Sequence, residues 1–204
     1  MGHRTTDELT AWMPHVLAAP HGEGALEMVV RRPTHDQREV LDAGVLDVAV
    51  GLVGDNWQER PSRDMPDGGP HPDKQLTIMN ARAAAMVAGE REQWPLCGDQ
   101  LYVDLDIGVD HLPPGTRLAI GEALVEVTEP PHTGCAKFTE RFGLDAMRFV
   151  NSPDGRAARL RGANAKVVRG GEVRPGDLVT VVPADAPVAA VEAAAGEGQA
   201  QPPA

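Results

Sequence analysis

A cysteine with an imidazole and an ammonium close by in the sequence is the group in this chain best suited to chemistry. In His132-Thr133-Gly134-Cys135-Ala136-Lys137, the thiol of Cys135 lies three residues after His132 and two before Lys137. A cysteine reacts as its thiolate, and a free thiol is only slightly ionised at neutral pH because its pKa is about 8.5. Positive neighbours, or a helix that begins near Thr133, would favour the thiolate. The alternative is a small buried hydrophobic residue.

The second cysteine, Cys97, is interpreted as a buried structural residue. The N-terminal residues lack the charged start, apolar middle and cleavage site of a signal peptide, and no apolar run approaches the length of a membrane span. We therefore expect a cytoplasmic protein, in which free thiols are favoured over a disulfide.

A predicted β-hairpin directly precedes Cys135 and would deliver it to a loop. Residues 116–120 and 123–127 alternate or run apolar as strands do, and Gly121-Glu122 between them is a two-residue turn in which glycine supplies a positive φ. Pro130-Pro131 ends the second strand. A reactive group in a loop on a rigid β scaffold is a common arrangement of a functional site.

The remaining chain is predicted to fold mainly into short strands. Gly occurs 22 times, Pro 18 times, and aromatic residues make up only 3%, so turns are frequent and the core is aliphatic. The expected helices are one over 8–17, capped by Thr6 or Asp7 with Pro14 as an unfavourable residue inside it, one or two helical turns over 36–43, a helix from Asn80 to about Glu92 and a helix over 144–150. The expected strands lie over 25–31, 75–79, 102–105 and 178–182, and residues 45–53 form an apolar segment.

The charge balance excludes several classes of partner. The chain of 204 residues has 30 acidic and 19 basic residues, which gives a net charge of −11. This balance argues against non-specific binding of nucleic acid and against an anionic membrane surface. The seven histidines are scattered and form no spaced pair with a cysteine that would indicate zinc. No P-loop, dinucleotide fingerprint or Ser-His-Asp arrangement is present.

Several short sequences, in this order, resemble the MOSC domain, the module at the C-terminus of molybdenum-cofactor sulfurases and in many stand-alone bacterial proteins. They are LPPGTRLAIGEALVEVTEP over 112–130, Cys135 with Lys137 and Phe138, and RGANAKVVRGGEVRPGDLVTVV over 161–182, with weaker matches in GLVGD over 51–55 and DKQLTIMNAR over 73–82. The resemblance covers about Met28 to Val182. It implies a mainly β fold, a barrel of the pyruvate-kinase-barrel type with a few short α-helices.

The predicted organisation is an N-terminal helical extension over 1–24, a MOSC barrel over 25–183 and a disordered Ala/Pro/Gly-rich tail over 184–204. The extension either docks on the barrel or contacts a partner, such as a second copy in a homodimer. The long polar loop over 56–73 is either a surface excursion or a flap over the site.

The resemblance also implies what Cys135 does. In the family this thiol is taken to bind the molybdenum of the cofactor molybdopterin or to carry persulfide sulfur, and some stand-alone relatives reduce N-hydroxylated compounds with partner electron donors. A non-catalytic module that delivers the cofactor is the alternative. Many members have Pro-Arg-x-Pro-Cys, whereas this chain has His132 for the arginine and Gly134 for the inner proline. No pyridoxal-phosphate lysine motif is visible, so a cysteine desulfurase or redox partner would be another protein.

A molybdopterin carries a phosphate, so its site needs fixed cations within this acidic protein. The predicted cofactor-binding residues are His132, Lys137, Arg141, Arg159, Arg161 and Lys166, with Cys135 as the metal ligand and catalytic residue. Further candidates are Arg31, Arg32, Arg38 and Arg169.

Overall fold

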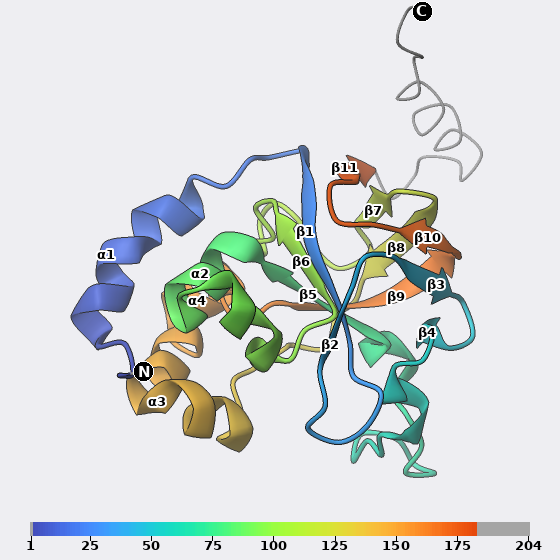
Figure 1. Cartoon of the computed structure of the whole chain (residues 1–204), viewed down its shortest axis with the longest axis horizontal. Helices are drawn as coiled ribbons and strands as arrows, with labels where there is room; N and C mark the ends of the chain where they lie inside the picture. Colours follow the sequence, from blue (N-terminus) through green and yellow to red (C-terminus); the bar gives the residue numbers. More distant parts are fainter. Residues whose placement is uncertain (1, 183–204) are drawn as a thin grey trace, which may run out of the picture.

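The computed structural model describes residues 2–182, and within them short strands and a few helices alternate (Figure 1). The strands are β1 (Glu23–Arg31), β2 (Glu39–Leu41), β3 (Gly44–Asp47), β4 (Gly51–Leu52), β5 (Leu76–Asn80), β6 (Leu101–Asp104), β7 (Arg117–Ile120), β8 (Ala123–Val127), β9 (Ala163–Arg169), β10 (Gly171–Val173) and β11 (Leu178–Val182). The helices are α1 (Thr6–Leu17), α2 (Ala81–Ala88), α3 (Ala136–Val150) and α4 (Pro153–Ala157), with 3-10 turns η1 (Asn56–Glu59), η2 (Pro72–Lys74) and η3 (Arg91–Cys97).

Seven strands close into a barrel, as expected. Their order is β11-β7-β8-β9-β5-β6-β1, and β1 pairs back with β11. The β5–β6 pair is parallel and the other barrel pairs are antiparallel. β2 extends the sheet beyond β1, and β10, β3 and β4 form a separate small sheet. Closure pairs the edges of the sheet, which would otherwise expose unpaired backbone groups.

The hairpin that precedes Cys135 forms as predicted. β7 and β8 pair through Ile120 and Ala123, and Gly121 between them has φ of 52°. A side chain at Gly121 would collide with the Asp177 carboxylate and the Glu172 carbonyl, so both the backbone angle and the space require glycine.

Two hydrophobic clusters lie on the two sides of the barrel wall. Aliphatic side chains fill the interior, among them Leu26, Ile78 and Val125. Outside, Met28, Met79 and Tyr102 pack with residues of α1, α2 and α3. Figure 1 shows these helices gathered on one side of the barrel, with the β3–β4–β10 sheet on the other. Successive side chains of a strand point to opposite faces of the sheet, so the same strands contribute residues to both clusters.

The predicted helices form, but several boundaries were wrong. Thr5 rather than Thr6 or Asp7 caps α1, in a capping box with Glu8, and the helix continues through Pro14. Its buried residues Leu9 and Val16 lie on either side of that proline, so packing along the whole helix outweighs the lost hydrogen bond.

Asn80 caps α2 as predicted, but α2 ends at Ala88 and not near Glu92. Gly89 has φ of 76° and closes the last turn, after which the chain continues as η3. The helix predicted over 144–150 forms after Gly143, whose φ of 87° separates it from a further helical stretch that begins at Ala136; together they make up α3. A helix start near Thr133 was considered, and the observed start is Ala136, with Cys135 at the N-cap position.

The helical turns expected over 36–43 were wrong. Residues 39–41 form β2, which pairs with β1 through Val29–Leu41 and Val30–Val40. A three-residue strand is too short to show an alternating pattern, and its pairing with β1 stabilises it.

The predicted domain boundaries stay a prediction, and the observed elements can only be placed beside them. α1 falls in the predicted extension, and β1 begins at Glu23. The predicted tail over 184–204 lies outside the described residues. Within residues 2–182, no helix has the length and apolar character needed to cross a membrane.

Candidate functional site

A cavity of about 680 Å³ opens beside Cys135. Its walls come from the segment after β1, the loop over 56–74, the end of η3, the loop before α3 and the residues before β9. Eight cationic side chains line it, against two carboxylates, Asp36 and Asp64. The cations are Arg32, Arg38, Arg60, Arg63, Lys74, Lys137, Arg141 and Arg161. In a chain with a net charge of −11, this concentration of positive charge indicates an anion-binding site.

Cys135 is exposed, lines the cavity and occupies the N-cap position of α3. Side chains from elsewhere fix the loop that carries it. The amide of Asn151 donates to the carbonyl of Gly134 at 3.4 Å and accepts from its N–H at 3.1 Å. A Cβ at Gly134 would lie 3.1 Å from this amide, so glycine permits the close approach. Asn164 donates to the carbonyl of Pro130 at 2.9 Å. The loop is therefore held at Pro130 and at Gly134, although Gly134 stands in place of the expected inner proline.

We call the buried part of the site the inner region: Arg32, Asp55, Cys97, Asp99 and Arg161. Arg161 donates to the Asp99 carboxylate at 2.6 Å and to the Cys97 carbonyl at 2.8 Å. Asp99 is fully buried and Arg161 is 6% exposed. Burial opposes the charge on Arg161, but Asp99 more than offsets this and raises the pKa of the guanidinium. The pair fixes one cation at the cavity wall.

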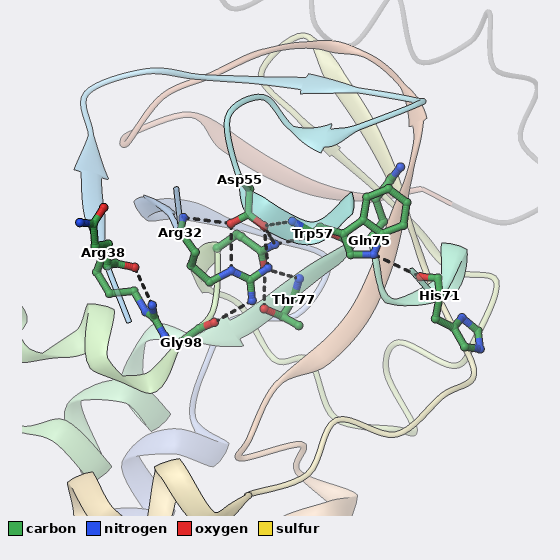
Figure 2. Close-up of polar contacts among 10 residues, drawn as sticks. Arg32, Arg38, Asp55, Trp57, His71, Gln75, Thr77 and Gly98 are labelled. Carbon is green, nitrogen blue, oxygen red and sulfur yellow. Dashed lines mark hydrogen bonds and ion pairs between the residues drawn. The ribbon is translucent and has the colours of Figure 1, made fainter. Parts of the chain in front are cut away.

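Arg32 forms the second buried ion pair of the inner region (Figure 2). Its Nε and Nη2 donate to the two oxygens of Asp55, each at 2.9 Å, and its Nη1 donates to the carbonyl of Gly98 at 3.2 Å. Asp55 also accepts from the backbone N–H of Trp57 at 3.0 Å and so caps η1. A bidentate pair of this kind holds the guanidinium plane in one orientation.

The remaining groups form what we call the outer region: Asp36, Cys135, Lys137 and Arg141. Lys137 Nζ donates to the Asp36 carboxylate at 2.6 Å, and Arg141 Nη2 donates to the same oxygen at 3.3 Å. The hydrogen bond from Lys137 is the main reason that the pKa of Asp36 is lowered. The side chains of Asp36 and Lys137 are about half exposed, at 51% and 45%. Ions this exposed exchange partners easily.

His132 lies between the two regions and is uncharged at neutral pH. Burial, and then the positive charge of Arg161, lower its pKa well below the ordinary value of 6.5. Its Nδ1 lies 3.3 Å from Asp99 Oδ1, but the two atoms are not aligned for a hydrogen bond, and both lack a hydrogen-bond partner among the described residues. The expected local positive charge from His132 is therefore not present.

The structure brings five of the predicted residues together at this cavity and places two elsewhere. His132, Cys135, Lys137, Arg141 and Arg161 line it. Arg159 instead donates to the carbonyls of Ile107 and Leu112, at 3.3 and 2.6 Å. Lys166 pairs with Glu126 and Asp73.

Strand geometry explains the position of Lys166. Ala165 and Val167, its neighbours on β9, belong to the barrel interior, so the side chain between them faces outward.

Of the four further candidate arginines, two line the cavity and two do not. Arg32 and Arg38 line the cavity, whereas Arg31 is paired with Glu39 and Arg169 donates to the carbonyl of Glu122.

Three cations that line the cavity were not predicted. Arg60, Arg63 and Lys74 come from the long polar loop and η2. The same loop brings Trp57, which is 8% exposed and donates from Nε1 to the carbonyl of His71 at 3.2 Å (Figure 2). The unusual length of the loop was the available signal that it takes part in the site.

The donor set fits a bound anion. Six buried polar side-chain atoms within the described residues lack a hydrogen-bond partner, and four belong to residues that line the cavity: Arg38 Nε, Asn56 Oδ1, His132 Nδ1 and Arg161 Nε. The two arginine Nε–H groups are donors that an anion could satisfy, whereas Asn56 Oδ1 is an acceptor. Arg38 and Arg60 are also crowded by like charge. Burial and then neighbouring arginines lower the pKa of both guanidinium groups. An anion in the cavity would relieve this repulsion and supply acceptors to the free N–H groups.

Comparison with known proteins gives one family and several similar folds. The family model of the MOSC domain matches residues 55–180. A YuaD protein from Bacillus subtilis has a solved structure that is 19% identical, with a TM-score of 0.55 over 78% of this chain and 95% of that one. YiiM from Escherichia coli is 20% identical, with a TM-score of 0.51 over 78% of this chain and 70% of that one. At this level of identity these structures support the fold alone. No curated protein matches the chain significantly.

Proposed function

Since the chain belongs to the MOSC domain family, we propose that its cationic cavity binds the molybdenum cofactor and that Cys135 is the sulfur ligand to the metal. The observation that carries this proposal is the placement of one exposed thiol among eight cationic side chains in an acidic protein. A soft thiolate suits molybdenum, and fixed cations suit the phosphate of a molybdopterin.

The two regions would share the binding. In the inner region, Arg32 and Arg161 are already oriented by their carboxylates, so little order is lost when they meet an anion. Arg161 Nε has no partner among the described residues and can donate to it. In the outer region, Lys137 can leave Asp36 and turn to the ligand, because both side chains of this contact are about half exposed. Arg141 is 20% exposed and also donates to the carbonyl of Leu96 at 2.7 Å, so it is held more firmly, and its Nη2 is the group that can exchange Asp36 for the ligand.

The chemistry of such a complex would come from the cofactor, which supplies redox chemistry at molybdenum when bound. The residues of this chain would bind the phosphate, present the Cys135 thiolate and keep a neutral imidazole, His132, at the wall. Reduction of N-hydroxylated compounds is the activity that we propose for the loaded protein, with electrons from a partner protein. A delivery module would bind the cofactor in the same way but would show no turnover.

A second candidate is supported by the exposure of Cys135. As a sulfur carrier, its thiolate would attack the outer sulfur of a persulfide on a partner cysteine desulfurase. That sulfur would pass to Cys135 and the thiolate of the partner would leave. This reaction needs no bound metal, so the two candidates can be separated.

The test is molybdenum analysis combined with intact mass on protein purified from a host that makes the cofactor. The matched pair is Cys135→Ser and Cys97→Ala, since both cysteines line the cavity but only Cys135 is exposed. Cofactor binding predicts molybdenum in the wild type and in Cys97→Ala, and its loss or strong reduction in Cys135→Ser.

The outcomes are distinct. A mass gain of one sulfur on Cys135 without molybdenum would favour the carrier. Molybdenum retained fully in Cys135→Ser would contradict a role for this thiol as ligand. Neither metal nor added sulfur in any variant would overturn both candidates.

A further inference from the structure

Two histidines and one aspartate converge where the segment after α1 meets the loop between β6 and β7, and none of the three lines the cavity beside Cys135. His21 lies in the segment between α1 and β1, whereas Asp106 and His111 lie in the loop between β6 and β7. Each offers one possible ligand atom, and these atoms all lie within 4.8 Å of one another. Segments more than 80 residues apart in the sequence thus place three metal-binding side chains together.

One oxygen of Asp106 faces both imidazoles. Asp106 Oδ2 lies 2.7 Å from His111 Nδ1 and 3.5 Å from His21 Nδ1. The other oxygen, Oδ1, accepts the backbone N–H of Gly108 at 2.7 Å. The backbone N–H of Asp106 in turn donates to the carbonyl of Pro20 at 2.8 Å. The carboxylate is therefore fixed by its own loop and by the residue next to His21, as the ligands of built metal sites are.

The two imidazoles are also held close together. Their ring centroids are 4.0 Å apart with planes tilted by 40°. Both rings bring an Nδ1 atom to the same carboxylate oxygen, Asp106 Oδ2. A divalent cation would be bound by these two nitrogens and this oxygen together.

The distances are near those of a small transition-metal site. With bonds of about 2.0–2.2 Å, the ligand atoms of a tetrahedral zinc site lie about 3.3–3.6 Å apart. The separation of Asp106 Oδ2 from His21 Nδ1, 3.5 Å, lies in this range, whereas its separation from His111 Nδ1, 2.7 Å, has hydrogen-bond length and must widen by about 0.6 Å or more when a metal binds. The side chains of His21 and His111 are about half exposed, at 56% and 47%, so small rotations are available to them.

We propose that His21 Nδ1, His111 Nδ1 and Asp106 Oδ2 bind a borderline divalent metal such as Zn²⁺, with water completing the coordination. Mixed imidazole and carboxylate ligands favour Zn²⁺, Co²⁺ or Ni²⁺ over Mg²⁺, which prefers oxygen ligands. The metal would join the segment after α1 to the β6–β7 loop. It would also be reachable from a second cavity of about 570 Å³, which Asp106 and His111 help to line.

The test is calorimetric titration of the untagged chain with Zn²⁺, and absorption spectroscopy with Co²⁺, in a Cys135→Ser background because an exposed thiol also binds zinc. The variants are His21→Ala and His111→Ala, with His15→Ala as the matched control, since His15 is an exposed histidine of α1 outside the cluster. These histidines are on the surface, so the variants are expected to fold, and circular dichroism checks this.

We expect one Zn²⁺ per chain, a cobalt spectrum with nitrogen and oxygen ligands, and a loss of affinity of about tenfold or more in His21→Ala and in His111→Ala but not in His15→Ala. Titration with Mg²⁺ should give no comparable binding. Equal affinity in all variants, or no saturable binding of Zn²⁺ or Co²⁺, would overturn the proposal. This test does not depend on the function proposed for the cavity.

Discussion

The inner and outer regions of the site contain the same kinds of groups and differ in burial. Each has a cysteine, at least one carboxylate and two cations. In the inner region both carboxylates are fully covered and the ion pairs are closed. In the outer region one half-exposed carboxylate, Asp36, is shared between Lys137 and Arg141. Burial therefore assigns the groups to different tasks: the inner cations are held in place, and the outer ones can exchange partners.

The two thiols differ in burial in the same way, and the resulting difference in their reactivity is the largest effect that we expect. Burial, and then the charge of Asp99, raise the pKa of Cys97, whereas Cys135 is exposed. Native protein treated with a thiol reagent should therefore be labelled once per chain, and Cys135→Ser should remove the label. Unfolding in denaturant should expose the second thiol. Rapid labelling of Cys97 in native Cys135→Ser would remove the distinction between the regions.

Replacement of a carboxylate of the inner region by alanine should strongly lower the free energy of unfolding. Asp55→Ala leaves Arg32 buried without its partner and removes the cap of η1, so we expect a loss of about 3–5 kcal/mol. Asp36→Ala is the matched control, because Asp36 is also paired with an arginine but is exposed. Urea denaturation should show a large shift of the midpoint for the first variant and almost none for the second. Similar shifts in both would contradict the comparison.

His132 should make the fold sensitive to acid. Its pKa is lowered in the folded protein by burial and by Arg161, so the unfolded chain binds the proton more readily. The contribution of neutral His132 to the free energy of unfolding is fully present above about pH 6.5. It should be lost as the pH falls below this value, with a slope that approaches about 1.4 kcal/mol per pH unit for one proton.

The matched variant His132→Gln should lack this component. Urea midpoints at about pH 7.5 and about pH 5.5 would give the difference between variant and wild type at each pH. The wild type should lose more stability than the variant on acidification. Parallel losses would show that His132 does not titrate between the two states.

The smallest expected effect concerns the outer region. Asp36→Asn removes the charge that occupies Lys137 and Arg141, so both become available to an added anion. We expect the affinity for pyrophosphate to rise about twofold to fivefold, and the gain to shrink at high salt. Asp42→Asn is the control for the change of net charge, since Asp42 is exposed and does not line the cavity. Equal gains in both variants would indicate a general charge effect.

Local features of the sequence were predictable, and long-range ones were not. The hairpin of β7 and β8 was found because its turn and alternation lie within a dozen residues. Cys135 and Lys137 were found because they are neighbours, and Arg161 because of the family resemblance. β2 also pairs with the strand just before it, but it was missed because three residues are too few to show an alternating pattern.

The cations of the site show the same limit. Arg60 and Arg63 come from a loop without periodicity, and nothing local indicates where their side chains lie. Lys166 was placed in the site because it is basic and near Arg161, but the direction of its side chain follows from the register of β9 against β5 and β8. Charge and spacing thus predicted a group of cations around Cys135, and the fold decided which of them line the cavity.

The most direct test of the account is X-ray absorption spectroscopy at the molybdenum edge, on protein purified from a cofactor-competent host, for the wild type and Cys135→Ser. If Cys135 is the ligand, the metal in the wild type has one protein sulfur ligand beyond those of the cofactor, and the variant either loses this sulfur from its spectrum or loses the metal. Molybdenum bound with the same sulfur ligands in both proteins would contradict it.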